Sequence, residues 1–145
     1  MGMPLTGKTT VGKALSKHLG ICFYDLDEYV ELKLGDSISN IINKEGEDKF
    51  RIIESNCLND IVNIDDHILS LGGGAVNSNN MDMLLNYSTR VWLKSNLQTL
   101  VSRFAKLKKN QRPLLDSNNL TESLNNIYIN RRENYKKCSN HPISI

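Results

Sequence analysis

The stretch that decides the fold is "GMPLTGKTT", residues Gly2 to Thr10. It fits the pattern G-x-x-x-x-G-K-[ST], in which successive backbone N–H groups curl around phosphates and the lysine neutralises their charge. The hydroxyl of Thr9 can in addition ligate Mg²⁺. The alternative is a glycine-containing turn that leads into an ordinary helix, against which Lys8 and the threonine pair argue. The stretch therefore predicts a phosphate-binding loop.

The residues that follow this loop predict a helix. From Thr9 to Leu19 apolar side chains recur at the spacing of one helical face, and Gly20 follows where a left-handed C-terminal cap is expected. Such a loop normally connects a buried strand to a helix, yet only Met1 precedes Gly2. We therefore expect either a chain that is cut short at this end or a sheet built without its usual central strand.

Short apolar runs alternate with helical patterns along the rest of the chain. Strands are expected at residues 21–24, 67–71, 89–94 and 141–145, and further helices at residues 28–34, 47–64, 96–104 and 120–137. Ser95 can cap the helix at 96–104. Strands that alternate with helices imply right-handed crossovers and a parallel sheet, so we expect a three-layer α/β/α fold in a single domain over residues 1–145.

The composition argues against several classes of protein. The chain has 145 residues, 23% of them charged, and a formal net charge of +2. This balance gives no field that favours nucleic acid or a membrane surface, and no apolar run approaches the ~20 residues of a membrane span. With no basic-then-apolar leader, we expect a cytoplasmic protein. The three scattered cysteines fit reduced thiols better than a disulfide framework or a zinc site.

Two aspartates end the first expected strand, in the sequence DLD. Asp25 and Asp27 are two residues apart, a spacing that puts both carboxylates on the same side of an extended strand. Ligands of open α/β sheets bind beyond the carboxyl ends of the strands. One aspartate can therefore hold Mg²⁺ near Thr9 while the other accepts a substrate hydroxyl. The alternative is a pair of cap residues for the helix that follows.

The segment EGEDKFRIIE places Arg51 and Glu54 three residues apart on a predicted helix, where the two side chains can pair. An ordinary surface ion pair is one interpretation. The other is a carboxylate-binding arginine that Glu54 holds in position, because a guanidinium group matches a carboxylate with two parallel hydrogen bonds.

Gly72, Gly73 and Gly74 directly follow the second expected strand. Consecutive glycines at a strand end suggest that another backbone or a ligand approaches too closely for any Cβ atom. A flexible turn would have the same sequence, so both interpretations stay open.

Two arginine-bearing segments lie late in the chain. QRPLL places Arg112 in a basic loop, and RRENY places Arg131 and Arg132 in a helix. These side chains are either solvated surface charges or cations for phosphoryl transfer. That reaction needs positive charge over the transferring group and exclusion of water, which an arginine-bearing lid provides.

The phosphate loop, D-x-D, G-E-x-x-F-R-x-x-E, G-G-G, R-P-L-L and R-x-x-x-Y together resemble, in order and spacing, the shikimate kinase family over essentially the whole chain. Each motif alone is weak, but the set in register is specific. The resemblance implies a P-loop fold of the nucleoside-monophosphate-kinase type with a parallel sheet. It also implies transfer of the γ-phosphoryl group of ATP to the 3-hydroxyl of shikimate, a step toward chorismate and the aromatic amino acids.

The resemblance assigns the nucleotide site residue by residue. The family's ATP phosphate loop matches Leu5, Thr6, Gly7, Lys8, Thr9 and Thr10. Lys8 would contact the phosphates, and Thr9 and Asp25 would lie at the metal. Arg112, in a lid loop at residues 105–118, matches an arginine that reaches the ATP phosphates. Arg103 is a looser match to an arginine beside the adenine.

On the acceptor side the resemblance points to residues 25–58 and to two later positions. Asp27 matches the aspartate that contacts the shikimate hydroxyls and is the expected base. Arg51 and Arg131 match the arginines that grip the substrate carboxylate, and Gly73 matches a glycine beside the substrate. Lys8, Asp27 and Arg112 would be catalytic. Shikimate and ATP are the expected partners, with Mg²⁺ as cofactor and a monomeric protein.

The sequence also departs from the family. Leu5 stands where many small-molecule kinases have glycine, so we expect the backbone there to do without a positive φ. Family members carry a first strand before Gly2 and continue past a stretch such as HPISI through an adenine-contacting segment and a closing helix. We therefore expect a fold that lacks the first strand and the C-terminal helix, from a truncated gene model or a start codon assigned too late.

Other functions stay open on the sequence. A gluconate kinase, or another small-metabolite kinase, would keep the phosphate loop but has no reason to keep both Arg51 and Arg131. The same holds for a nucleoside-monophosphate kinase. A non-catalytic nucleotide-binding relative would bind ATP without shikimate-dependent turnover.

Overall fold

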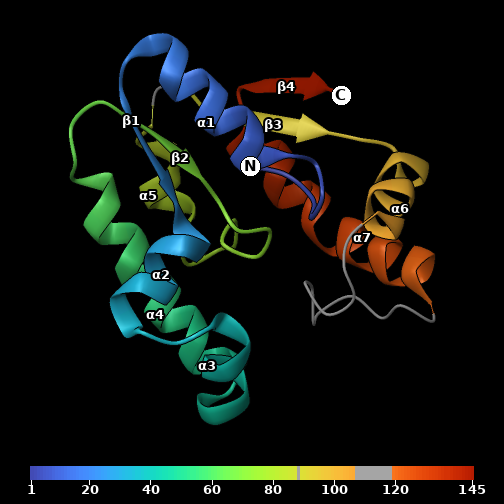
Figure 1. Ribbon diagram of the computed structural model, residues 1–145, viewed down its shortest axis with the longest axis horizontal. Helices are drawn as coiled ribbons and strands as arrows, with labels where there is room; N and C mark the ends of the chain where they lie inside the picture. Colours follow the sequence, from blue (N-terminus) through green and yellow to red (C-terminus); the bar gives the residue numbers. More distant parts are fainter. Residues whose placement is uncertain (88, 107–118) are drawn as a thin grey trace.

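The computed structural model describes residues 1–87, 89–106 and 119–145, and its strands form two parallel pairs. β1 (Cys22–Asp25) pairs with β2 (His67–Ser70), and β3 (Val91–Lys94) pairs with β4 (His141–Ser144), as Figure 1 shows. These strands overlap the stretches that the sequence predicts. Their parallel pairing confirms the expected α/β class.

Helices connect the strands. They are α1 (Lys8–Leu19), α2 (Leu26–Leu34), α3 (Ile38–Glu45), α4 (Glu47–Val62), α5 (Met81–Leu85), α6 (Leu97–Ala105) and α7 (Leu120–Cys138). The sequence predicts α1, α2, α4, α6 and α7, and these are confirmed. It does not predict α3 and α5, although Ser37 is a typical N-cap whose side chain accepts a hydrogen bond from the Asn40 N–H.

The helix caps are partly as expected. Gly20 ends α1 in the left-handed region at φ 69, and its N–H donates to the Ser16 carbonyl. The expected cap of α6, Ser95, is wrong. Asn96 adopts the extended cap conformation and accepts a hydrogen bond from the Thr99 N–H, because α6 begins one residue later than the pattern indicates.

The first residues of the chain lie beside β3. The Leu93 N–H donates to the Met1 carbonyl, and Gly2 forms a parallel bridge with Leu93. A Cβ atom on Gly2 would lie 2.5 Å from the Leu93 carbonyl oxygen, so this approach requires glycine. The phosphate loop therefore begins next to the carboxyl end of β3.

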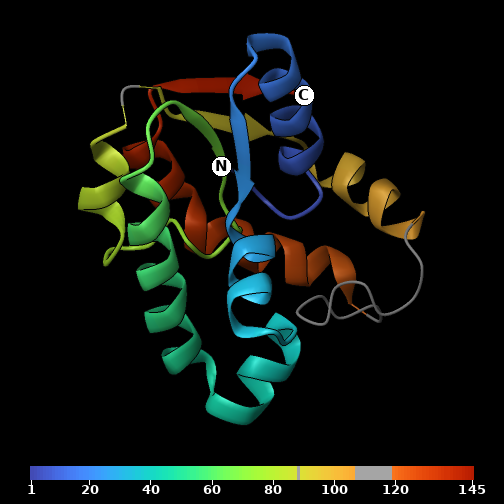
Figure 2. The same ribbon diagram turned by 60° about the vertical axis from the view of Figure 1, so that its left-hand side comes forward.

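Helices pack on the strands through close contacts. α1 contacts β1 and β2, and a Cβ atom on Gly12 would collide with the Phe23 ring. α7 packs Tyr135 against Trp92 of β3, with ring centroids 5.8 Å apart. Helices α2, α3 and α4 extend together away from the β3–β4 pair, as the two views in Figures 1 and 2 agree. Within the described residues, no helix has the length and apolar character needed to cross a membrane.

Candidate active site

Hydrogen bonds to the Met3 carbonyl oxygen hold the phosphate loop in its conformation. This oxygen accepts hydrogen bonds from the Thr6 hydroxyl at 2.9 Å and from the Lys8 ammonium at 3.0 Å. Gly7, at the N-cap of α1, takes a left-handed conformation with φ 81 and ψ 25, which turns the chain into the helix. The loop thus presents the N-terminus of α1, where backbone N–H groups and the helix dipole favour an anion.

Leu5 contradicts the expectation that its backbone avoids positive φ. Its φ is 68, in the left-handed region that is costly for a residue with a Cβ atom. The loop therefore adopts at Leu5 a conformation that glycine adopts readily, and this strains the leucine. The reason lies in tertiary contacts. The Arg103 guanidinium donates to the Leu5 carbonyl at 2.9 Å, and the Leu5 side chain packs against the core.

Thr9 and Asp25 meet where α1 begins and β1 ends. The Thr9 hydroxyl donates to Oδ2 of Asp25 at 2.6 Å, and Asp25 is buried. A hydroxyl and a carboxylate are oxygen ligands of the kind Mg²⁺ prefers, which usually binds one or two such groups together with water and phosphate oxygens. In the described part of the chain no group of three or more His, Cys, Asp or Glu side chains could hold a metal by itself.

Asp27 lies differently from the extended geometry expected for DLD. It belongs to the first turn of α2, and Asp25 is the N-cap, whose side chain accepts a hydrogen bond from the Asp27 N–H at 3.1 Å. The strand ends at Asp25 because this cap starts a helix there. The cap interpretation thus describes Asp25, while the Asp27 carboxylate points at Gly72, where an added Cβ would collide with Oδ1.

The three glycines each face one charged side chain. Besides the contact between Gly72 and Asp27, a Cβ atom on Gly73 would lie 2.7 Å from Nη1 of Arg131. On Gly74 it would lie 2.6 Å from Nη1 of Arg51. The turn consists of glycines because three charged groups, from α2, α4 and α7, occupy the space that side chains would fill.

Arg51 is held in a fixed position by two carboxylates of its own helix. Its Nη1 pairs with the buried Glu54 at 2.9 Å, and its Nη2 pairs with Glu47 at 2.8 Å. Burial raises the pKa of Glu54, and the Arg51 guanidinium only partly offsets this effect. A cavity of about 580 Å³ opens beside Arg51, lined among others by Asn77 and Gly74.

Tyr135 joins the acceptor side to the phosphate loop. Its hydroxyl donates to the Gly73 carbonyl at 2.7 Å, lies 3.3 Å from the Gly2 carbonyl oxygen, and is hydrogen-bonded to Arg131. The side chain is fully buried, and this burial raises the pKa of its hydroxyl. Sequence reasoning gave Tyr135 no role, although the R-x-x-x-Y spacing puts it one helical turn after Arg131.

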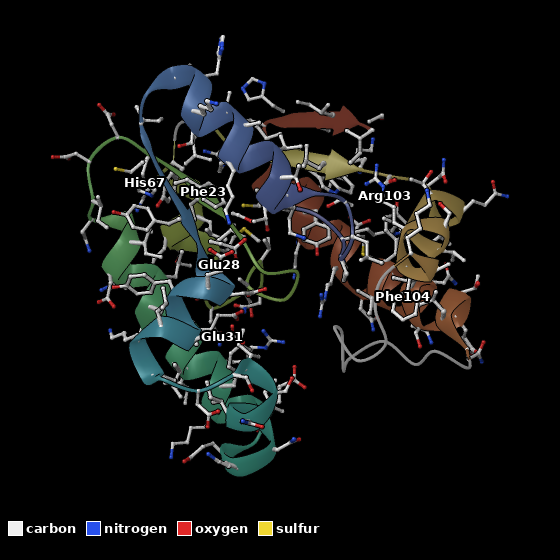
Figure 3. All side chains as sticks on the ribbon, in the orientation of Figure 1. Phe23, Glu28, Glu31, His67, Arg103 and Phe104 are labelled. Atoms are coloured by element: carbon white, nitrogen blue, oxygen red, sulfur yellow. The ribbon has the colours of Figure 1, made fainter. Side chains whose placement is uncertain are left out.

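The remaining residues that the sequence assigns to the nucleotide differ in where they lie. Thr6 is buried inside the loop, whereas Thr10 is exposed on α1. Arg103 lies on α6 and reaches toward the loop (Figure 3). Arg112 and residues 107–118 of the expected lid lie outside the described residues. The structure therefore brings together Lys8, Thr9, Asp25, Asp27, Arg51, Gly73 and Arg131 around the loop and the glycine turn.

Comparison with known proteins assigns this arrangement to one family. The family model described as shikimate kinase matches residues 4–144. A shikimate kinase of Clostridium botulinum (strain Okra) is 38% identical over 139 residues, which are 95% of this chain and 81% of that protein.

Solved structures agree. A shikimate kinase from Acinetobacter baumannii in complex with shikimate superposes with a TM-score of 0.91 at 32% identity, covering 99% of this chain and 80% of that one. The shikimate kinase of Bacteroides thetaiotaomicron also gives a TM-score of 0.91, at 28% identity and with coverage of 99% and 83%. These likenesses confirm the expected P-loop kinase fold. The chain belongs to the shikimate kinase family.

Proposed function

We propose that this protein transfers the γ-phosphoryl group of ATP to the 3-hydroxyl of shikimate, which forms shikimate 3-phosphate for chorismate and aromatic amino acid biosynthesis. The family supports the reaction. The observation that carries the assignment in this chain is the convergence of Asp27, Arg51 and Arg131 on one glycine turn, with the phosphate loop joined to that turn by Tyr135.

The nucleotide binds at the loop from Gly2 to Thr10. Backbone N–H groups at the start of α1 hold the phosphates, because they point outward and the helix dipole adds positive potential. The Lys8 ammonium now donates to the Met3 carbonyl and exchanges this bond for oxygens of the outer phosphates. Its positive charge then balances the charge that spreads over the phosphoryl oxygens in the transition state.

Thr9 and Asp25 would hold Mg²⁺ through the Thr9 hydroxyl and the Asp25 carboxylate. Their oxygens are close together at the mouth of the loop, so the ligand chemistry suits the ion. When bound, Mg²⁺ neutralises charge on the β- and γ-phosphates. Until the ion binds, the hydrogen bond between the two side chains keeps both in place.

The acceptor is a small cyclic carboxylate with hydroxyl groups. Arg51 and Arg131 bind its carboxylate through charge-assisted hydrogen bonds, and Gly73 lets the ring lie against the backbone. Glu54 and Glu47 fix the Arg51 guanidinium before substrate arrives, which reduces the rotamer entropy lost on binding.

Asp27 accepts the proton of the attacking hydroxyl. The acceptor oxygen forms a bond to the γ-phosphorus while the bond between that phosphorus and the bridging oxygen breaks, and ADP leaves with the electron pair. Positioning and electrostatics supply most of the acceleration in such reactions, and a base typically adds ~10²- to 10⁴-fold. In this proposal Arg112 would contact the ATP phosphates, as the resemblance to the family implies.

A gluconate kinase is the nearest competing function. It would use the same phosphate loop, and its substrate also carries a carboxylate. The match to the shikimate kinase family over residues 4–144 therefore favours shikimate as the acceptor. A regulatory relative that binds ATP without turnover is the competitor from another class.

Coupled measurement of ADP release separates these functions. With purified protein, ATP and Mg²⁺, we expect release that depends on shikimate and stays at background with gluconate. Release with gluconate alone would favour the other kinase, and ATP binding without release under either condition would favour the regulatory relative. Activity as a monomer, a cytoplasmic location and a single domain with its lid at residues 105–118 stay predictions.

A further inference from the structure

The Leu5 backbone is the one part of the described phosphate loop where the sequence and the conformation conflict. A left-handed φ of 68 is readily adopted by glycine and is unfavourable for leucine. Strained residues at binding sites persist only where the surrounding structure holds them. The contacts of Leu5 must therefore offset the free-energy cost of its left-handed backbone.

Two contacts hold Leu5. Its side chain is partly buried and packs against the hydrophobic core. Its carbonyl oxygen accepts a hydrogen bond of 2.9 Å from Nη1 of Arg103, a residue 98 positions away on α6. A hydrogen bond from a guanidinium group is stronger than one between neutral groups. Arg103 is thus a long-range partner of the loop at its strained residue.

We propose that Arg103 is a positioning residue of the phosphate loop, which keeps Leu5 left-handed through its carbonyl and so keeps the following N–H groups directed at the phosphates. Through this contact Arg103 supports phosphate binding, a role that differs from the adenine contact that the resemblance implies for it. The inference deepens the proposed function, because it concerns how the same site binds its nucleotide, but it does not depend on which acceptor the enzyme uses.

The identity of residue 5 makes the role stronger in this chain. If residue 5 were glycine, the loop would adopt the left-handed conformation without help, and loss of Arg103 would matter less. With leucine at residue 5, a loop that lacks Arg103 has other backbone conformations of lower free energy. Arg103 and Leu5 are therefore coupled energetically, and a double-mutant cycle measures this coupling.

The first test compares two ligands that share phosphates but not a base. Arg103→Met removes the donor and keeps an apolar stem. We expect it to weaken binding of Mg²⁺–ATP and of inorganic tripolyphosphate by a similar factor of about tenfold, as loss of a charge-assisted hydrogen bond predicts. If only ATP binding weakens, Arg103 acts on the adenine side and the proposal is wrong; it is equally wrong if neither ligand is affected.

The second test is rescue. In the Arg103→Met background, Leu5→Gly should recover about half or more of the lost affinity on a logarithmic scale, and this gain should exceed its effect in the otherwise unchanged protein. Equal effects of Leu5→Gly in both backgrounds would mean no coupling and would overturn the proposal.

A matched control removes the same charge elsewhere. Arg132→Met changes an exposed arginine on α7 and should leave affinity for both ligands unchanged. Wild-type protein that binds ATP but shows no shikimate-dependent ADP release would contradict the proposed function and leave this cycle interpretable. Wild-type protein that binds neither ATP nor tripolyphosphate would contradict both proposals.

Discussion

The proposed nucleotide side and the proposed acceptor side of this site are built by different means. The nucleotide side is a continuous stretch from Gly2 to Thr10 that presents backbone groups and is ordered by its own hydrogen bonds together with one from Arg103. The acceptor side is a turn without side chains, and its charges come from Asp27, Arg51 and Arg131 on three different helices. One side is local in sequence, and the other is assembled by the fold.

This difference predicts that the two sides can be damaged separately. Backbone groups survive most side-chain substitutions, so nucleotide binding should depend on the conformation of the loop. The acceptor side should instead lose affinity or rate with each charged group that is removed or displaced. The following changes, in order of decreasing expected effect, sharpen or break this separation.

Asp27→Asn should have the largest effect. The amide keeps the shape of the side chain but cannot accept the hydroxyl proton, so kcat should fall by ~10²- to 10⁴-fold. The affinity for ADP should stay near that of the wild type, because Asp27 belongs to the acceptor side. Steady-state kinetics and ADP titration provide the measurement. A loss of ADP affinity as large as the loss of rate would break the separation.

Gly73→Ala should displace Arg131 without unfolding the protein. The φ of Gly73 is not in the left-handed region, and the added Cβ would meet the far end of a flexible side chain at 2.7 Å. The Arg131 guanidinium must therefore move, and misplacement of a binding group on this scale raises the shikimate KM by about 10- to 100-fold.

Gly35→Ala is the matched control for this change. Its added Cβ meets nothing within 4 Å, but its φ of 66 is left-handed, so the variant should lose ~1 to 2 kcal/mol of unfolding free energy and keep its KM. If both alanine variants changed KM alike, crowding at the turn would not be the cause.

Tyr135→Phe should break the separation, because the Tyr135 hydroxyl contacts both sides. The ring still packs on Trp92, but the Gly73 carbonyl loses its donor, which should lower the free energy of unfolding by ~1 to 3 kcal/mol. We expect the KM values for shikimate and for ATP to rise together. Urea denaturation and kinetics test this, and an increase in one KM alone would show that the hydroxyl serves only that side.

Substitution of Asp36 should have the smallest effect, and it should change only the stability of the protein. Hydrogen bonds from Lys44 and Asn40 lower the pKa of this partly exposed carboxyl to about 2, from an ordinary value of 3.8. The folded pKa is depressed, so the stabilisation is present above about pH 4 and is lost as the pH falls toward 2. Asp36→Asn should flatten the dependence of unfolding free energy on pH in that window. An unchanged slope between these pH values would contradict the assignment.

The contrast between the two sides also explains what the sequence could predict. The phosphate loop and α1 are local, and their periodicity and the Gly20 cap predict them directly. The three consecutive glycines predict that another group approaches this turn closely. Only the fold shows that the side chains of Asp27, Arg51 and Arg131 fill that space. Tyr135 was missed because its importance comes from two carbonyls far away in the sequence.

Two errors have the same physical origin. Leu5 was expected to avoid a left-handed backbone because leucine does so on its own, and the bond from Arg103 overrides that preference. Asp27 was expected on an extended strand, but the Asp25 side chain starts α2 two residues earlier than the apolar pattern suggests. In both cases a hydrogen bond between a side chain and the backbone accompanies a local conformation that the sequence pattern does not show.

The central claim is that side chains from separate helices recognise the acceptor while the loop recognises the nucleotide. Calorimetric titration of Arg131→Ala with shikimate and with ADP tests it most directly, with Arg132→Ala as the neighbouring control. We expect Arg131→Ala to raise the Kd for shikimate by about 10- to 100-fold and to leave the Kd for ADP within about twofold, while Arg132→Ala changes neither. Equal shikimate affinities in the two variants would contradict the account.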